Sequence, residues 1–96
     1  MTEGARAIVV LPGVLREEAG GAGRLEVRAG GTLGGVLDEV AARWPRLERR
    51  IRDEQGELRR FVNVYVNGED CRGLSGQATT VTAGAEIQVL PSIAGG

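Results

Sequence analysis

The chain has 96 residues, which suffice for one domain with a single hydrophobic core. Its 12 basic and 13 acidic residues nearly cancel, and Trp, Tyr and Phe occur once each, so the sequence lacks the basic excess and the stacking side chains of a nucleic-acid-binding protein. Histidine is absent, which removes the commonest general base and metal ligand, and we expect neither a catalytic triad nor a metal site.

Three further features of the composition limit what the protein can do. All 12 basic residues are arginine, so no side-chain amine is available for isopeptide chains between copies of the protein. Cys71 is the only cysteine, which excludes a disulfide framework and suits a reducing cytoplasm, and without a histidine partner we expect it to be a small buried hydrophobe. The apolar run 7–11 is too short for a signal sequence or a membrane span, so we expect a cytoplasmic protein with no membrane partner.

The first third of the sequence predicts two strands. Residues 6–11 are apolar after the first, rich in β-branched side chains and followed by Pro12, which is typical of a buried strand. Residues 24–28 alternate charged and apolar side chains, which predicts a half-buried strand. The glycine-rich stretch 20–23 lacks the residues that follow the glycines of a phosphate-binding loop, so we expect it to be the turn between the strands.

Two helices are predicted next. Thr32 is a favourable N-cap, and apolar residues then recur at helical spacing over 33–44 until Pro45 ends the pattern. A short second helix or turn is predicted over 46–52, because two large apolar residues lie four positions apart there. The glycine-containing stretch 53–57 is predicted to be a polar loop.

The last third predicts three strands. Residues 61–66 lead into Asn67-Gly68, the strongest short signal for a hairpin turn, with 69–71 as the short return strand. Alternation places Val62, Val64 and Val66 on the core face and Phe61, Asn63 and Tyr65 on the opposite face. After an irregular stretch, a last strand over 86–90 turns Ile87 and Val89 inward and leaves Leu90 on the face of Phe61.

This order of elements predicts an α+β protein with the β-grasp, or ubiquitin-like, fold. A mixed sheet of about five strands would be crossed on one face by one main helix, with the other face partly open. Because no repeat, low-complexity tract or linker is visible, we expect residues 1–96 to form a single domain with a flexible tail over 91–96.

Three motifs carry a family resemblance over essentially the whole chain. They are Gly-Thr-Leu-Gly-Gly-Val-Leu at 31–37, Arg-Phe-Val-Asn-Val-Tyr-Val-Asn at 60–67, and Leu-Pro-Ser-Ile-Ala-Gly-Gly at 90–96. With them the chain resembles the ubiquitin-like sulfur carriers of the MoaD/ThiS superfamily. It looks most like the branch that supplies sulfur for cysteine synthesis from O-phosphoserine, because of the motif at 60–67, the Glu-Asp pair at 69–70 and the motif at 90–96. It looks less like the thiamin carriers, which are shorter and lack the 45–60 segment.

The resemblance implies a chemical cycle at the C-terminal carboxylate of Gly96. An E1-like adenylating enzyme would activate that carboxylate with ATP, a sulfur donor would displace AMP, and the resulting thiocarboxylate would donate sulfur to a partner such as a pyridoxal-phosphate-dependent cysteine synthase. The carrier would then be a co-substrate, not an enzyme, with no bound cofactor. Gly95 suits a narrow channel because glycine lacks Cβ.

Two surfaces are candidates for docking these enzymes. Phe61, Tyr65 and Leu90 are predicted to form an apolar patch beside the reactive tail, because aromatic residues are favoured anchors at interfaces. The resemblance adds the tail residues Pro91, Ile93 and Ala94 as partner contacts. The arginines at 43–60 could steer an acidic partner, but acidic residues lie among them, and we expect a solvated, salt-bridged face.

Three alternative destinations for the activated tail remain open at this point. The chain could be the small subunit of molybdopterin synthase, a sulfur donor for secondary metabolites, or a ubiquitin-like modifier conjugated to lysines of other proteins. All three use the same activated carboxylate, so the sequence pattern does not separate them.

Overall fold

The computed structural model describes residues 5–29 and 31–92, and within these ranges it contains seven strands and three α-helices. The strands are β1 (Arg6–Val10), β2 (Arg24–Arg28), β3 (Gly31–Thr32), β4 (Val62–Val66), β5 (Glu69–Asp70), β6 (Thr80–Val81) and β7 (Glu86–Pro91). The helices are α1 (Gly13–Arg16), α2 (Leu33–Arg43) and α3 (Pro45–Ile51), and three 3₁₀ turns are η1 (Glu17–Ala19), η2 (Cys71–Gly73) and η3 (Gly76–Ala78).

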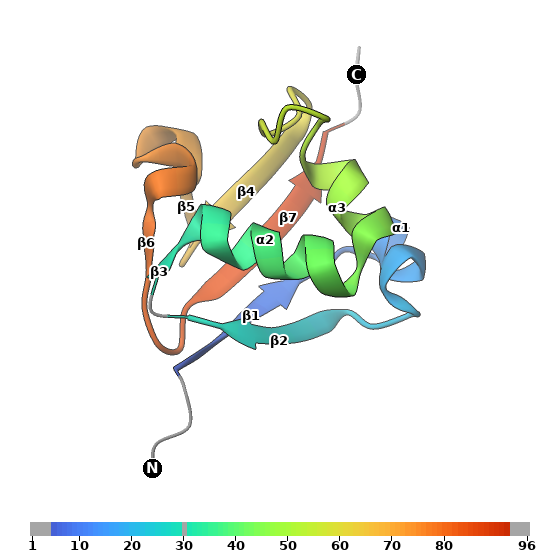
Figure 1. Cartoon of the computed structure of the whole chain (residues 1–96), viewed down its shortest axis with the longest axis horizontal. Coiled ribbons are helices and arrows are strands. Elements are labelled where there is room, and N and C mark those ends of the chain that lie inside the picture. Colours follow the sequence, from blue (N-terminus) through green and yellow to red (C-terminus); the bar gives the residue numbers. More distant parts are fainter. Residues whose placement is uncertain (1–4, 30, 93–96) are drawn as a thin grey trace.

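Five of the strands form one mixed sheet in the order β2-β1-β7-β4-β5. The central pair β1 and β7 is parallel, and the other neighbours are antiparallel. The long helix α2 crosses one face of this sheet, with α3 beside it (Figure 1). The predicted α+β arrangement, a five-stranded mixed sheet under one main helix, is therefore confirmed.

The helix α2 forms where the apolar spacing predicted it. Its N-cap is Thr32, whose Oγ1 accepts a hydrogen bond of 3.1 Å from the Gly35 backbone N–H. The apolar stripe that faces the sheet is buried, and it consists of Leu33, Val36, Leu37 and Val40. The helix ends at Arg43, one residue earlier than predicted, because Trp44 adopts a non-helical conformation and Pro45 begins α3 at its first turn.

Alternation places the core correctly on the β4 and β7 strands. Val64 is fully buried and lies opposite Val89, also fully buried, and Ile87 completes the inward row of β7. The β4 strand runs into the predicted turn, where Asn67 and Gly68 both have positive φ, as a two-residue hairpin turn with matching twist requires.

Two segments differ from the sequence prediction. The connection between β1 and β2 was predicted as a turn, but it contains α1 and η1, since Leu15 and Ala19, four residues apart, are both buried in the core. The short return strand ends at Asp70, one residue earlier than predicted, because the Asp70 side chain accepts a hydrogen bond from the Arg72 N–H and starts η2 there. Cys71 is fully buried, as predicted.

Arg52 does not belong to a solvated arginine face, contrary to the sequence prediction, because its side chain is buried. Arg43, Arg46 and Arg50 are exposed and ion-paired as expected, but the side chain of Arg52 is only 8% exposed. Its guanidinium donates to Glu48 on α3 at 2.7 Å and to Asp38 on α2 at 2.9 Å.

The third bond of the Arg52 guanidinium extends the network to a distant segment. Its Nη1 donates to Gln77 Oε1 in η3 at 2.9 Å, and Gln77 in turn donates to the Gly56 carbonyl at 2.7 Å. Burial alone would lower the pKa of Arg52, but the hydrogen bonds and charges of Glu48 and Asp38 outweigh burial and raise it. Arg52 therefore stays charged and joins four segments of the chain.

We expect Arg52→Ala to lower the free energy of unfolding by about 3 kcal/mol, because it leaves the half-buried Glu48 carboxylate without its cation. Chemical denaturation measures this loss. The matched control is Arg49→Ala, an exposed arginine on the same helix that should change stability by less than about 0.5 kcal/mol. Equal effects of the two substitutions would contradict the assigned role of Arg52.

The outer edge of β2 is covered by side chains of α2. Glu39 Oε1 accepts from the Arg28 backbone N–H at 2.9 Å, and Arg43 Nη1 donates to the Glu26 carbonyl at 3.0 Å. Glu39 and Arg43 are themselves paired at 2.7 Å. The Arg28 N–H and the Glu26 carbonyl, which could otherwise pair with a strand of another molecule, are thus occupied.

This edge contact predicts a pH dependence of stability. Partial burial alone would raise the pKa of Glu39, but its bonds with the Arg28 N–H and Arg43 outweigh burial and lower the pKa. A lowered folded-state pKa stabilises the protein above the ordinary carboxyl range, and this stabilisation is lost as pH falls through the lowered value.

We therefore expect Glu39→Gln to be less stable than the parent at neutral pH, with the difference shrinking on acidification to about pH 3. Thermal melts of both proteins across this range provide the measurement. Glu54→Gln in the exposed 53–57 loop is the control for removal of a surface carboxylate, and it should change stability at neutral pH by less than about 0.5 kcal/mol. A gap that stays constant across the range would contradict the assignment.

Candidate functional site

The end of β7 is held in place by β4 and by the turn before it. The Ser92 N–H donates to the Phe61 carbonyl at 2.6 Å, and Asn63 Nδ2 donates to Ser92 Oγ at 3.0 Å. Arg72 Nη1 reaches Asn63 Oδ1 at 3.3 Å. The predicted partner and reactive residues Ile93, Ala94, Gly95 and Gly96 lie outside the described residues, so the structure shows only the point from which the tail departs.

The sheet face opposite α2 carries two of the predicted docking residues. Tyr65 lies across from Gln88, and Asn63 lies across from Leu90, so Tyr65 and Leu90 share this face on neighbouring strands. Leu90 is 36% exposed and Tyr65 is half-buried.

The same face contains two apolar residues that sequence reasoning missed. Ile8 and Val10 on β1 are half-buried and alternate with Ala7 and Val9, which are fully buried. Val10 lies across from Gln88, in the same row as Tyr65. The continuous apolar run of β1 was interpreted as a strand buried on both faces, but the period of two could have placed Ile8 and Val10 outward.

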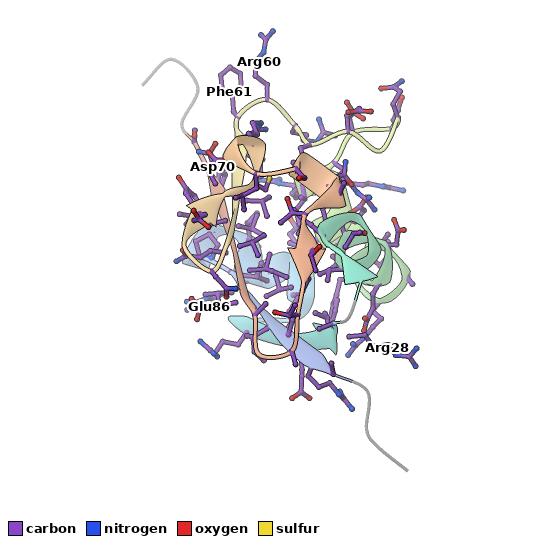
Figure 2. All side chains as sticks on the ribbon, turned by 90° about the vertical axis from the view of Figure 1, so that its left-hand side faces the viewer. Arg28, Arg60, Phe61, Asp70 and Glu86 are labelled. Atoms are coloured by element: carbon purple, nitrogen blue, oxygen red, sulfur yellow. The ribbon has the colours of Figure 1, made fainter. Side chains whose placement is uncertain are left out.

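Phe61 and Pro91 are two further residues of the predicted partner-binding set, and they lie just before β4 and at the end of β7. Phe61 precedes β4 and is 49% exposed, and it projects with Arg60 at the end of the molecule opposite Arg28 (Figure 2). Pro91 lies across from Val62, which belongs to the inward-facing row of β4. Because Phe61 lies outside β4, its predicted grouping with Tyr65 and Leu90 stays a prediction.

A cleft of about 490 Å³ opens where β4 begins and β7 ends. It is lined by three arginines, three apolar residues and one serine: Arg50, Arg59, Arg60, Phe61, Val62, Pro91 and Ser92. Two of these residues, Phe61 and Pro91, belong to the predicted partner-binding set.

The described part of the chain contains neither a metal-binding cluster nor a membrane-spanning helix, and its one thiol is disfavoured as a nucleophile. Residues 5–29 and 31–92 hold no group of three or more His, Cys, Asp or Glu side chains that could bind a metal ion. Burial and the neighbouring Asp70 charge raise the pKa of the Cys71 thiol, so the nucleophilic thiolate is disfavoured. None of the described helices has the length and apolar character needed to cross a membrane.

Comparison with known proteins agrees with this geometry over nearly the whole chain. The ThiS family matches residues 9–96. The sulfur carrier protein CysO of Mycobacterium tuberculosis (strain ATCC 25618 / H37Rv) is 39% identical over 90 residues, 92% of this chain and 96% of that protein. Small archaeal modifier protein 1 of Haloferax volcanii is 37% identical over 73 residues, 76% of this chain and 79% of that protein.

A solved structure is similar as well. A chain of the Amycolatopsis orientalis BexX/CysO complex superposes with a TM-score of 0.84 at 37% identity, covering 94% of this chain and 99% of that one. The fold and these relatives define a small ubiquitin-like carrier protein and not an enzyme. Within that class, the chain belongs to the ThiS family of the MoaD/ThiS superfamily of sulfur carriers.

Proposed function

We propose that the protein carries sulfur as a thiocarboxylate on Gly96. An E1-like enzyme uses ATP to form an acyl-adenylate at the Gly96 carboxylate, and a sulfur donor then displaces AMP. The observation that carries the proposal is the family match, which includes Gly95 and Gly96 and extends five residues past the end of β7 at Pro91. The carrier itself needs no cofactor, because the activating enzyme uses the ATP.

We propose an enzyme of cysteine synthesis as the sulfur acceptor, such as a pyridoxal-phosphate-dependent cysteine synthase. The 39% identity to a sulfur carrier protein named CysO over 92% of the chain supports this destination. The likeness to a chain of the BexX/CysO complex supports a docked complex between the carrier and a partner enzyme.

Protein modification is a second candidate function. It is favoured by the 37% identity to small archaeal modifier protein 1 of Haloferax volcanii, a protein whose name denotes a modifier. The two functions share the activated carboxylate and differ in the nucleophile that meets it, sulfur for a carrier and a lysine amine for a modifier.

The intact mass of the protein distinguishes these functions. After incubation with ATP and an extract of the producing cell, a carrier gains about 16 mass units, because sulfur replaces one carboxyl oxygen. A modifier instead becomes covalently joined to larger proteins, which are visible as bands that resist denaturation. Retention of the parent mass with ATP present, and no such bands, would contradict both functions.

The exposed side chain of Leu90 is predicted to contribute to the affinity for the activating enzyme. We expect Leu90→Ala to weaken the complex with the activating enzyme by about 1–3 kcal/mol while leaving the fold intact, since Leu90 is an exposed apolar side chain beside the tail. Calorimetric titration measures the affinity. Val14→Ala is the matched control, because Val14 is 70% exposed but lies on α1. If both variants bind like the parent, the docking surface lies elsewhere.

A further inference from the structure

The cleft at the end of β7 carries positive charge that the described chain neutralises only in part. Arg60 is exposed and makes no hydrogen bond or ion pair with residues 5–29 and 31–92. Arg50 reaches its one acidic partner there, Glu18, only at 3.9 Å. Arg59 uses its Nε to donate to the Arg49 carbonyl at 2.7 Å, a neutral acceptor.

No acidic side chain lines this cleft, although the whole chain has a net charge of −1. Its arginines are all exposed, so they form a cationic rim, and Phe61, Val62 and Pro91 supply the apolar part of its lining. A site for a small free anion gathers several donors around one enclosed point. An open groove with apolar lining and a cationic rim instead fits an extended segment that presents both carboxylates and an apolar side chain.

We propose that this cleft receives an acidic polypeptide segment, containing at least one apolar side chain, of the enzyme that takes up the C-terminal tail. The inference rests on the proposed function for the identity of that enzyme. It adds a second contact surface, because Val62 belongs to the helix-covered side of the sheet, whereas Tyr65 and Leu90 lie on the opposite face. Partner contacts would therefore flank the tail where it leaves Ser92.

Charge complementarity at such a rim acts mainly on the rate of encounter and on its salt dependence. Arg60 is the clearest site for a test, since its side chain makes no hydrogen bond or ion pair within the described residues, whereas Arg59 is bonded to α3. Arg28 provides a matched control, because it is also exposed and lies at the opposite end of the molecule (Figure 2).

The test is a titration of the isotope-labelled full chain with a synthetic glutamate-rich peptide that contains two leucines, followed by NMR. We expect amide shifts at Arg60, Phe61, Val62 and Ser92, weaker binding at high salt, and no such shifts with a peptide in which lysine replaces each glutamate. Arg60→Glu should weaken binding by about tenfold. Arg28→Glu should leave it unchanged, and thermal melts establish that both variants are folded.

Several outcomes would overturn the proposal. They are equal effects of Arg60→Glu and Arg28→Glu, equal binding of the lysine peptide, and shifts confined to the face of Tyr65 and Leu90. Shifts at the cleft that depend on protein concentration without peptide would show that a second copy of this chain occupies it, which also overturns the proposal.

A parallel assay separates this inference from the proposed function. Formation of the thiocarboxylate in extract with ATP, followed by intact mass, should be slower for Arg60→Glu than for Arg28→Glu. If the parent gains sulfur and both variants gain it at the parental rate, the acidic partner segment is wrong and the carrier function stands. If the parent gains no sulfur, the carrier function fails, and the peptide titration alone decides whether the cleft binds acidic segments.

Discussion

Deletion of Gly96 is expected to abolish ATP-dependent adenylation of the protein while leaving its fold intact. The deletion draws the reactive carboxylate back by up to about 3.5 Å along the chain. Misplacement of about 1 Å at a reacting centre can already cost roughly a hundredfold in rate. The fold should persist because the last strand ends at Pro91, and the buried core residues in the described part of the chain all precede it.

ATP–pyrophosphate exchange with the activating enzyme measures this loss. Gly95→Val should have a similar effect, since it adds a branched side chain where the tail must enter a narrow channel. Gly31→Val is the matched control, because a Cβ at Gly31 meets no atom within 4 Å and the residue lies in a strand. Normal exchange by the chain without Gly96 would refute the proposed chemistry.

Val64→Asp is expected to unfold the protein or to lower its free energy of unfolding by more than about 4 kcal/mol. Val64 is fully buried on β4, opposite Val89, and an aspartate there would be an unpaired charge in the core. Urea denaturation followed by circular dichroism provides the measurement.

The same substitution at an exposed valine tests whether burial is the cause. Val14→Asp on α1, where the side chain is 70% exposed, should change stability by no more than about 0.5 kcal/mol. Parental stability of Val64→Asp would mean that the inward row of β4 is wrongly assigned.

The elements that could be predicted from the sequence are those with strong local signals. The Thr32 cap, the apolar spacing of α2 and the break at Pro45 all lie within one short stretch. The alternation of β4 and the Asn67-Gly68 turn are equally local. The reactive end at Gly95-Gly96 was proposed from sequence and family resemblance, and it remains a prediction, because these residues lie outside the described part of the chain.

The small sheet could not be predicted from local pattern. β3 and β6 have two residues each, and Gly31 pairs with Val81 across fifty positions of sequence. Such short strands carry no usable alternation, so their pairing depends on how the neighbouring segments pack.

By itself, the sequence determined the class of the protein, the order of the five strands of its main sheet with its main helix, and the inward rows of β4 and β7, because period and capping act over a few residues. Only the tertiary structure decided which charges are buried and which are free. Arg52 and Arg60 are indistinguishable in an arginine-rich sequence, yet folding brings Asp38, Glu48 and Gln77 around the first and leaves the second exposed in the cleft. The reason is physical: Asp38 and Gln77 are 14 and 25 residues away from Arg52 in the sequence and meet it only in the folded chain.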